Sequence, residues 1–139
     1  MDDLAWLAMR AADALASSFA TVSREAGLSD LRDWLVLALV ADGRQRTQLE
    51  IADELAIDKT TLVAVLDRLE REGLVVRTAS DRDRRVRIPV ATEKGVAVRD
   101  QVKVARDAAL NQRLASIAEE DRAHFHATLW AIVQGQDGS

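Results

Sequence analysis

The hydrophobic pattern changes its period in the middle of the chain, and this change constrains the fold more than any other feature. Between 48 and 72, apolar residues recur every three or four positions, which predicts two short helices. From 74 to 90 the pattern becomes short β-branched runs around a polar stretch, which predicts a β-hairpin. Only 56–58 separate the two helices, a spacing typical of a helix-turn-helix. The sequence therefore predicts a helix-turn-helix that is followed at once by a two-stranded wing.

Capping residues set the expected bounds of the two helices. Thr47 suits the N-cap of a helix over 48–56, and Asp58 suits the N-cap of a helix that runs to Glu72. Gly73 is then the expected C-terminal stop.

The second strand of the hairpin is expected to lie at an edge. Pro89 lacks a backbone N–H and cannot donate to a neighbouring strand on that side. Val86, Ile88 and Val90 alternate with polar residues and Pro89, which predicts that these three side chains share one face.

Longer helical patterns flank this unit. Apolar stripes predict helices over 4–22 and 31–39 before it, and over 92–117 and 119–133 after it. In the last helix Phe125, Leu129, Ile132 and Val133 are expected on one face, and the chain is expected to fray from Gly135 onward. The fold class is therefore mainly α with a small β wing, a winged helix-turn-helix in a single domain. Residues 44–91 are expected to form its DNA-binding lobe, and 1–43 with 92–139 its dimerisation helices and scaffold.

The length of the helix predicted over 92–117 bears on the oligomeric state. At 1.5 Å per residue it would extend about 39 Å, whereas a compact 139-residue globule is only about 37 Å across. One subunit could not cover such a helix. The terminal helices are therefore expected to form an isologous homodimer.

The composition excludes several classes of protein. With 48% hydrophobic residues and one proline in 139, the chain is globular rather than disordered or fibrous. It has no cysteine, which excludes disulfides, thiolate metal sites and cysteine nucleophiles. No apolar run approaches the roughly 20 residues that span a bilayer, and the acidic start Met1-Asp2-Asp3 is unlike a signal peptide. A cytoplasmic protein without a membrane partner is expected.

The distribution of charge is more informative than its sum. The formal net charge is −4, but 77–87 holds five arginines and two aspartates, a local net charge of +3. This stretch is the predicted wing. A basic hairpin beside a helix-turn-helix favours a partner with phosphates, namely double-stranded DNA.

Five segments, in order and spacing, resemble the MarR family of bacterial transcriptional regulators. The segment 47–55 is similar to the first helix of that family's helix-turn-helix, and 57–63 with 66–75 to its recognition helix and exit. Asp83-Arg84-Arg85 and Thr92-Glu93-Lys94-Gly95 resemble its wing signature of Asp-x-Arg leading to Thr-x-x-Gly. The resemblance implies that Arg85 inserts into DNA and that Asp83 positions it.

The residues expected to contact DNA follow from how such a motif docks. A recognition helix enters the major groove with its N-terminal residues nearest the bases. The expected contacts on the second helix are Lys59, Thr60, Thr61, Ala64 and, two turns further along, Arg68. For the first three of these, ordinary helix-start residues are an equally good interpretation. Thr47 and Gln48 begin the first helix, where free backbone N–H groups suit a phosphate oxygen.

The wing arginines can reach an adjacent minor groove, whose narrow A·T-rich stretches attract cations. The candidates are Arg77, Arg82, Arg84, Arg85 and Arg87. A solvated loop is the alternative interpretation of such a turn, but a helix-turn-helix before it favours DNA.

Other candidate sites are weaker. His124 and His126 lie about 200° apart around a helix, so they cannot hold one metal ion as an i, i+4 pair could. Glu119-Glu120-Asp121 suits a helix start better than acid–base catalysis. Trp34 is expected in the core. The family resemblance also implies a small aromatic or phenolic effector between the dimerisation helices and the DNA-binding lobe, with Trp34 as a pocket wall. No cofactor, metal or catalytic residue is predicted.

These features favour a homodimeric, sequence-specific regulator, in the first place a repressor, that binds a pseudo-palindromic operator. Release by a small effector is implied by the resemblance alone. The alternative is a winged-helix protein-interaction module that does not bind DNA, since a fold does not fix a function. An enzyme is not expected, because the chain has no Gly-rich phosphate loop and no histidine–carboxylate pair at usable spacing.

Overall fold

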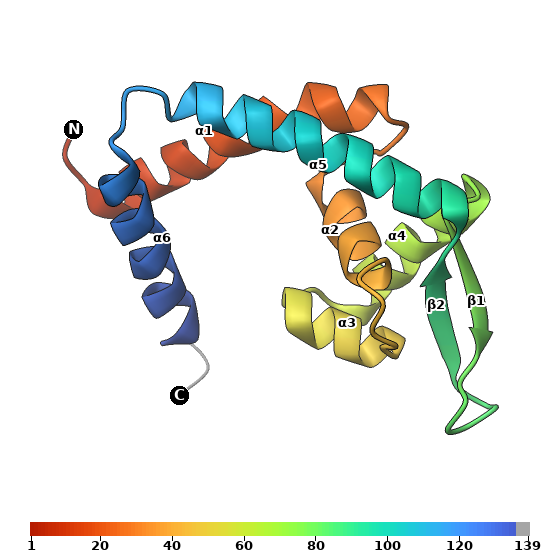
Figure 1. Cartoon of the computed structure of the whole chain (residues 1–139). Coiled ribbons are helices and arrows are strands. Elements are labelled where there is room, and N and C mark those ends of the chain that lie inside the picture. Colours follow the sequence, from red (N-terminus) through yellow and green to blue (C-terminus); the bar gives the residue numbers. More distant parts are fainter. Residues whose placement is uncertain (136–139) are drawn as a thin grey trace.

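The computed structural model describes residues 1–135 as six helices and one two-stranded sheet (Figure 1). The helices are α1 (Leu4–Glu25), α2 (Leu31–Val40), α3 (Gln48–Leu55), α4 (Lys59–Arg71), α5 (Glu93–Arg113) and α6 (Glu119–Gln134). The strands are β1 (Val75–Ala79) and β2 (Arg87–Ala91). The mainly helical fold with a small β wing is confirmed. Of the segment predicted to fray, 136–139 lie outside the described residues.

The helix-turn-helix forms where the capping residues predicted it. Thr47 closes a capping box at the start of α3: its Oγ1 accepts the Glu50 N–H at 3.2 Å, and Glu50 Oε2 accepts the Thr47 N–H at 3.1 Å. Asp58 Oδ1 accepts the Thr61 N–H at 2.7 Å and caps α4. Between them Ala56 adopts a left-handed conformation with φ of 52°, which turns the chain within a few residues.

The wing is an antiparallel ribbon in which residues on one face of β2 differ in burial. Val76 pairs with Val90, and Arg77 pairs with Pro89. Ile88 and Pro89 are both buried, whereas Val90 is exposed. Ile88 and Val90 share a face, because they are two residues apart in one strand, but on that face Val90, opposite Val76, is exposed. Each strand has a free edge, as Pro89 requires.

The start of α5 is fixed on the exit from α4. The Thr92 N–H donates to the Leu74 carbonyl at 3.0 Å, and Thr92 Oγ1 donates to the Gly73 carbonyl at 2.6 Å. Lys94 Nζ reaches the Glu72 carbonyl at 2.8 Å. At Gly95 the backbones approach so closely that a Cβ would overlap the Leu74 carbonyl oxygen.

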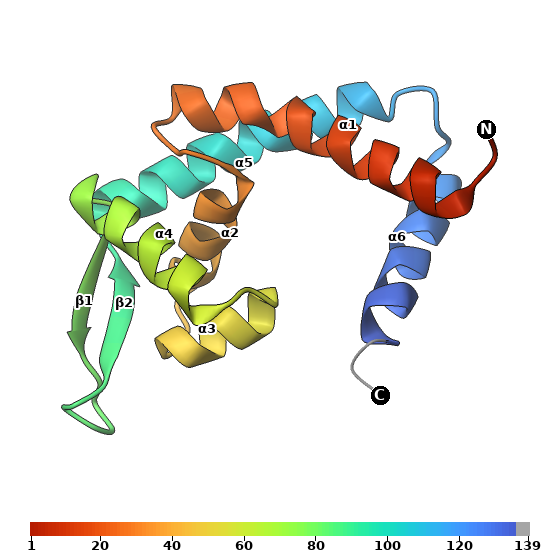
Figure 2. The ribbon, with the colours of Figure 1, turned by 180° about the vertical axis from the view of Figure 1, so that it is seen from behind.

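The elements form an upper layer and a lower lobe. Helices α1 and α5 lie side by side along the top of Figure 1, and the same pair is seen from behind in Figure 2. Helix α2 descends from this layer and packs against α3 and α4, and the wing projects beside them. The side chains that α2 and α4 bury between them include Val36, Leu37, Leu62, Leu66 and Leu69. This core holds the recognition helix on the rest of the chain.

Helix α5 is shorter than predicted. It ends at Arg113 and so extends about 32 Å, which does not exceed the diameter of about 37 Å of a compact chain of this length. The prediction of one helix over 92–117 is therefore wrong, and its length is no argument for a second subunit.

Helix α6 bears on the question of a second subunit in a different way. It extends from the far end of α5 beside the start of α1 (Figures 1 and 2), and none of its residues is buried. The four residues predicted to share one face, Phe125, Leu129, Ile132 and Val133, are between 42% and 59% exposed. Within residues 1–135 this face is left exposed, and the expectation that α6 helps to form a dimer stays a prediction.

Candidate nucleic-acid interface

The start of α4 presents an exposed polar surface. Lys59, Thr60 and Ala64 are exposed, and Thr60 and Ala64 lie on the side of the helix away from the buried Leu62 and Leu66. Thr61 is half-buried, and its backbone N–H and its Oγ1 both donate to the Asp58 carboxylate at 2.7 Å. These two bonds hold the pKa of Asp58 below its usual value. Lys59, Thr60 and Ala64 are therefore available to a partner, whereas Thr61 completes the cap.

The start of α3 is less open than expected. The Thr47 hydroxyl and N–H are both engaged in the capping box with Glu50. Gln48 is half-buried. A phosphate that bound here would accept from the backbone N–H groups of Gln48 and Leu49, which a capping box leaves free.

The tip of the wing carries a braced arginine. The side chain of Arg85 is 92% exposed, and its backbone N–H and Nε both point to Asp83 Oδ1, at 3.0 and 3.3 Å. Arg82, Arg84 and Arg87 are also exposed. The Ser80 N–H donates to the Val86 carbonyl at 2.8 Å and closes the hairpin beneath them. This arrangement is the one expected of a side chain that enters a groove.

Arg77 has a different position from the other wing arginines. It lies near the base of the wing, where its Nη1 binds Glu70 at 2.9 Å and its Nη2 binds Asp67 at 2.7 Å. Both carboxylates are on α4. Arg77 therefore links the wing to the recognition helix, and its contact with DNA stays a prediction.

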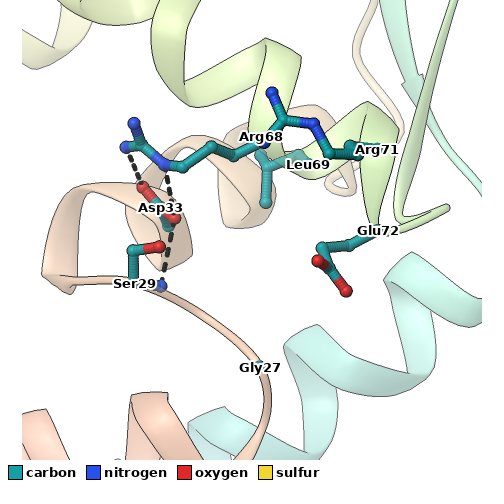
Figure 3. Close-up of a pocket in the computed structure, with 7 residues that line it drawn as sticks. All are labelled: Gly27, Ser29, Asp33, Arg68, Leu69, Arg71 and Glu72. Atoms are coloured by element: carbon teal, nitrogen blue, oxygen red, sulfur yellow. Dashed lines mark hydrogen bonds and ion pairs between the residues drawn. The ribbon is translucent and has the colours of Figure 1, made fainter.

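Arg68 also forms an ion pair within the protein. Its Nη2 lies 2.7 Å from Oδ1 of Asp33, a buried carboxylate on α2 (Figure 3). In this structure its guanidinium is thus paired within the protein, and its contact with a base or phosphate stays a prediction.

Trp34 is buried at the junction of α1, α2 and α5. Its Nε1 donates to the Arg99 carbonyl at 3.3 Å. The guanidinium carbon of Arg106 lies 3.8 Å from the centroid of the Trp34 ring and 4.4 Å from that of Phe19. Burial lowers the pKa of this guanidinium, and its Nε has no hydrogen-bond partner among residues 1–135. The two rings thus hold a half-buried cation by cation–π contacts.

Comparison with known proteins agrees with this geometry. A family model described as the MarR family matches residues 26–86. A solved transcriptional regulator of the MarR family from Rhodococcus sp. RHA1 has a TM-score of 0.86 and 29% sequence identity, over 94% of each chain. CouR from Rhodococcus jostii RHA1, bound to p-coumaroyl-CoA, has a TM-score of 0.85 and 30% identity, over 94% of this chain and 92% of its own. The chain belongs to the MarR family.

Two further comparisons concern the function of MarR-family relatives. The transcriptional repressor CouR bound to a 23-mer DNA duplex is similar over 96% of this chain and 93% of its own, with a TM-score of 0.82 and 30% identity. The HTH-type transcriptional regulator MhqR of Bacillus subtilis (strain 168) is 27% identical over 89 residues, which are 64% of this chain and 61% of MhqR. The alignment thus spans less than two thirds of that curated relative.

Sequence reasoning missed Arg106, although this MarR-family chain contains a signal for it. Val98, Val102 and Arg106 are four residues apart, so Arg106 continues the inward stripe of α5. A charged residue at a stripe position must find a buried partner or a ligand. Its aromatic partners, Phe19 and Trp34, come from two other helices and follow only from the fold.

Two cavities lie near these residues. One of about 300 Å³ lies between α1 and the start of α2 and is lined in part by Phe19, Ala20 and Arg24. The other, of about 120 Å³, lies beside the Asp33–Arg68 pair (Figure 3). Phe19 therefore contacts both the larger cavity and the Arg106 guanidinium.

The described part of the chain has neither a metal-binding cluster nor a membrane-spanning helix. Within residues 1–135, no three His, Cys, Asp or Glu side chains are grouped so that they could hold a metal ion. None of the described helices combines the length and apolar character needed to cross a membrane.

Proposed function

We propose that the protein is a homodimeric transcriptional repressor, not an enzyme, that binds a pseudo-palindromic DNA operator. The observation that carries this proposal is the exposed Arg85, braced by Asp83 at the tip of a basic wing. The wing and α3 project from the same side of the molecule, away from α1 and α5 (Figure 2). Lys59 and Thr60 are exposed at the start of α4. One docking surface of this kind can engage a major groove and an adjacent minor groove.

The dimer is supported by apolar side chains that one chain leaves uncovered. α1 and α6 expose Leu4, Trp6, Leu7, Met9, Phe125, Leu129, Trp130, Ile132 and Val133. An apolar surface of this extent marks an interface, and a second copy supplies the same surface in an isologous arrangement. Two α4 helices about 34 Å apart would then enter successive major grooves.

The effector is supported by the cation between Phe19 and Trp34. CouR, at 30% identity, is solved with p-coumaroyl-CoA, an aromatic acyl thioester. In this chain Arg106 offers a guanidinium whose Nε lacks an acceptor among residues 1–135, next to two aromatic rings. A small aromatic or phenolic acid would satisfy both features, with its carboxylate on Arg106. Such a ligand releases DNA if it binds better to a dimer whose α4 helices are wrongly spaced.

DNA selection from a random pool tests the function. We expect the full-length protein to enrich a palindromic sequence, and its affinity to fall steeply as salt rises. Arg85→Ala should weaken operator binding about tenfold or more, whereas Arg10→Ala, a change of the same charge on α1, should not. A pool without enrichment, or an affinity that neither salt nor Arg85→Ala alters, would favour the protein-interaction module.

A second assay tests the effector. Aromatic carboxylic acids and their coenzyme A thioesters are added to the operator complex, and DNA release is followed by fluorescence anisotropy. Arg106→Met keeps a long side chain between the rings but removes the charge, so it should retain DNA binding and lose the response to acids. Arg113→Met is the control, because Arg113 is exposed on the same helix. Release that Arg106→Met leaves unchanged would contradict the role of Arg106.

A further inference from the structure

Asp33 and Arg68 join α2 to the recognition helix by a two-point contact. Arg68 Nη2 lies 2.7 Å from Asp33 Oδ1, and Arg68 Nε lies 3.3 Å from Asp33 Oδ2 (Figure 3). Asp33 is 2% exposed, whereas the Arg68 side chain is 34% exposed. A bidentate arginine–carboxylate pair fixes orientation as well as distance.

The carboxylate of Asp33 is itself held in place. It lies in the first turn of α2, where the helix dipole favours a negative charge. Its Oδ2 accepts the Ser29 N–H at 3.2 Å, and its own N–H donates to Asp30 Oδ1 at 3.2 Å. Asp33 therefore presents a fixed acceptor to α4.

Arg68 is far from the part of α4 that faces a partner. It is nine residues after Lys59, about 13 Å along the helix axis. A contact at this distance from the start of α4 controls the direction in which Lys59, Thr60 and Ala64 point. The cavity beside the pair, lined also by Gly27, Ser29 and Glu72, leaves room for Arg68 to move if Asp33 no longer holds it.

We propose that Asp33 is a positioning residue for DNA recognition, which it serves by fixing α4 through Arg68, and that Arg68 itself does not contact DNA. This inference rests on the proposed DNA-binding function. Loss of one partner leaves the other charge uncompensated, so the pair resists separation. The competing account is that Arg68 contacts a phosphate and Asp33 contributes only to stability.

The dependence of affinity on salt separates the two accounts. Each phosphate contact contributes about 0.9 to the slope of log affinity against log salt. The selected operator is titrated with wild type, Asp33→Asn, Arg68→Gln and the double variant at several salt concentrations. Asp33→Asn removes the charge with little change of shape, and Asp13→Asn on α1 is the control for net charge.

We expect each single variant to bind the operator about tenfold more weakly, with the wild-type salt slope, since no phosphate contact is lost. The double variant should be no weaker than the weaker single variant, because both changes break the same link. Arg68→Lys retains one ion pair, so alone it should bind the operator more tightly than Arg68→Gln does. Combined with Asp33→Asn, the lysine has no carboxylate to pair with and should give no such advantage.

Two results would overturn the inference: a salt slope that Arg68→Gln reduces, or an affinity that Asp33→Asn leaves unchanged. Circular dichroism at the assay temperature shows whether each variant is folded, and if Asp33→Asn is not, the slope of Arg68→Gln still decides. If wild type binds no DNA, the proposed function fails. If wild type binds and depends on Arg85 but not on Asp33, only the present inference fails.

Discussion

Oδ1 of Asp83 accepts both the backbone N–H and the Nε of Arg85, at 3.0 and 3.3 Å. The rest of the Arg85 side chain is in solvent. One carboxylate thus limits the conformations of an arginine that contacts little else, which lowers the entropy lost when that arginine binds.

Asp83→Asn is expected to lower the ratio of operator affinity to random-sequence affinity. Loss of a charge-assisted hydrogen bond weakens operator binding by roughly threefold or more, while loss of a negative charge in the wing favours any DNA. Fluorescence anisotropy with the two DNAs measures the ratio. Asp81→Asn removes the same charge nearby, but within residues 1–135 Asp81 binds Gln45 and no arginine. An Asp83→Asn ratio equal to that of Asp81→Asn would show that the brace has no effect.

Gly95→Ala is expected to destabilise the fold. The added methyl group would overlap the Leu74 carbonyl oxygen, and overpacking against backbone costs about 1–3 kcal/mol or more. Urea unfolding at a fixed protein concentration measures the change in the free energy of unfolding. Gly135→Ala makes the same change at an exposed residue with φ of −66° and should alter stability by less than about 0.5 kcal/mol. Equal effects at the two positions would contradict the packing argument.

The stability that Asp42 contributes is expected to be lost in acid. Bonds from the Arg46 guanidinium, at 2.8 Å, and from the Arg44 N–H hold the pKa of Asp42 well below its usual value. A carboxyl whose pKa is lowered by folding stabilises the fold above its unfolded pKa, near 3.9, and ceases to do so as pH falls. Asp42→Asn should therefore reduce the free energy of unfolding at pH 7 by about 0.5–1 kcal/mol, because Asp42 is exposed and solvent screens its charge.

The same variant separates this effect from a general loss of stability. The difference between wild type and Asp42→Asn, measured by urea unfolding, should shrink as pH falls from about 4 toward 2. Asp13→Asn, at an exposed site on α1, is the control. A difference that stays constant across this range would rule out titration of Asp42 as the cause.

Leu129→Asp is expected to dissociate the proposed dimer. A carboxylate in the apolar surface of α6 would have to be buried without a partner, which should weaken association on the order of 100-fold. Sedimentation velocity at micromolar concentration reports the mass. Leu49→Asp, at an exposed leucine of α3, should leave the mass unchanged. A Leu129→Asp protein that remains dimeric would place the interface elsewhere.

The local structure could be predicted from the sequence because its determinants are local. Thr47 and Asp58 cap the helices they were expected to cap, and the change of period correctly located the wing. The end of α5 was missed for an equally local reason: 114–118 is Leu-Ala-Ser-Ile-Ala, and none of these residues breaks a helical pattern.

The roles of individual arginines could not be predicted in the same way. Arg68 binds Asp33, which is 35 residues away in the sequence. Arg77 binds two carboxylates of the preceding helix, and Arg106 finds its aromatic partners on α1 and α2. Among the arginines predicted to contact DNA, Arg85 has its partner two residues away, and this pair was the one that the wing motif implied. Contacts that cross between elements depend on the packing of those elements, which periodicity does not specify.

Asp33 and Trp34 are consecutive residues on α2, about 100° apart around its axis. One of them holds the recognition helix, and the other contacts Arg106 and the backbone of Arg99 on α5. A single peptide bond therefore joins a residue at the proposed effector site to a residue that holds the proposed DNA-recognition helix. A helix of ten residues moves as a rigid body. A tilt of α2 caused by a change at Trp34 would therefore also displace Asp33, with no rearrangement of side chains between them.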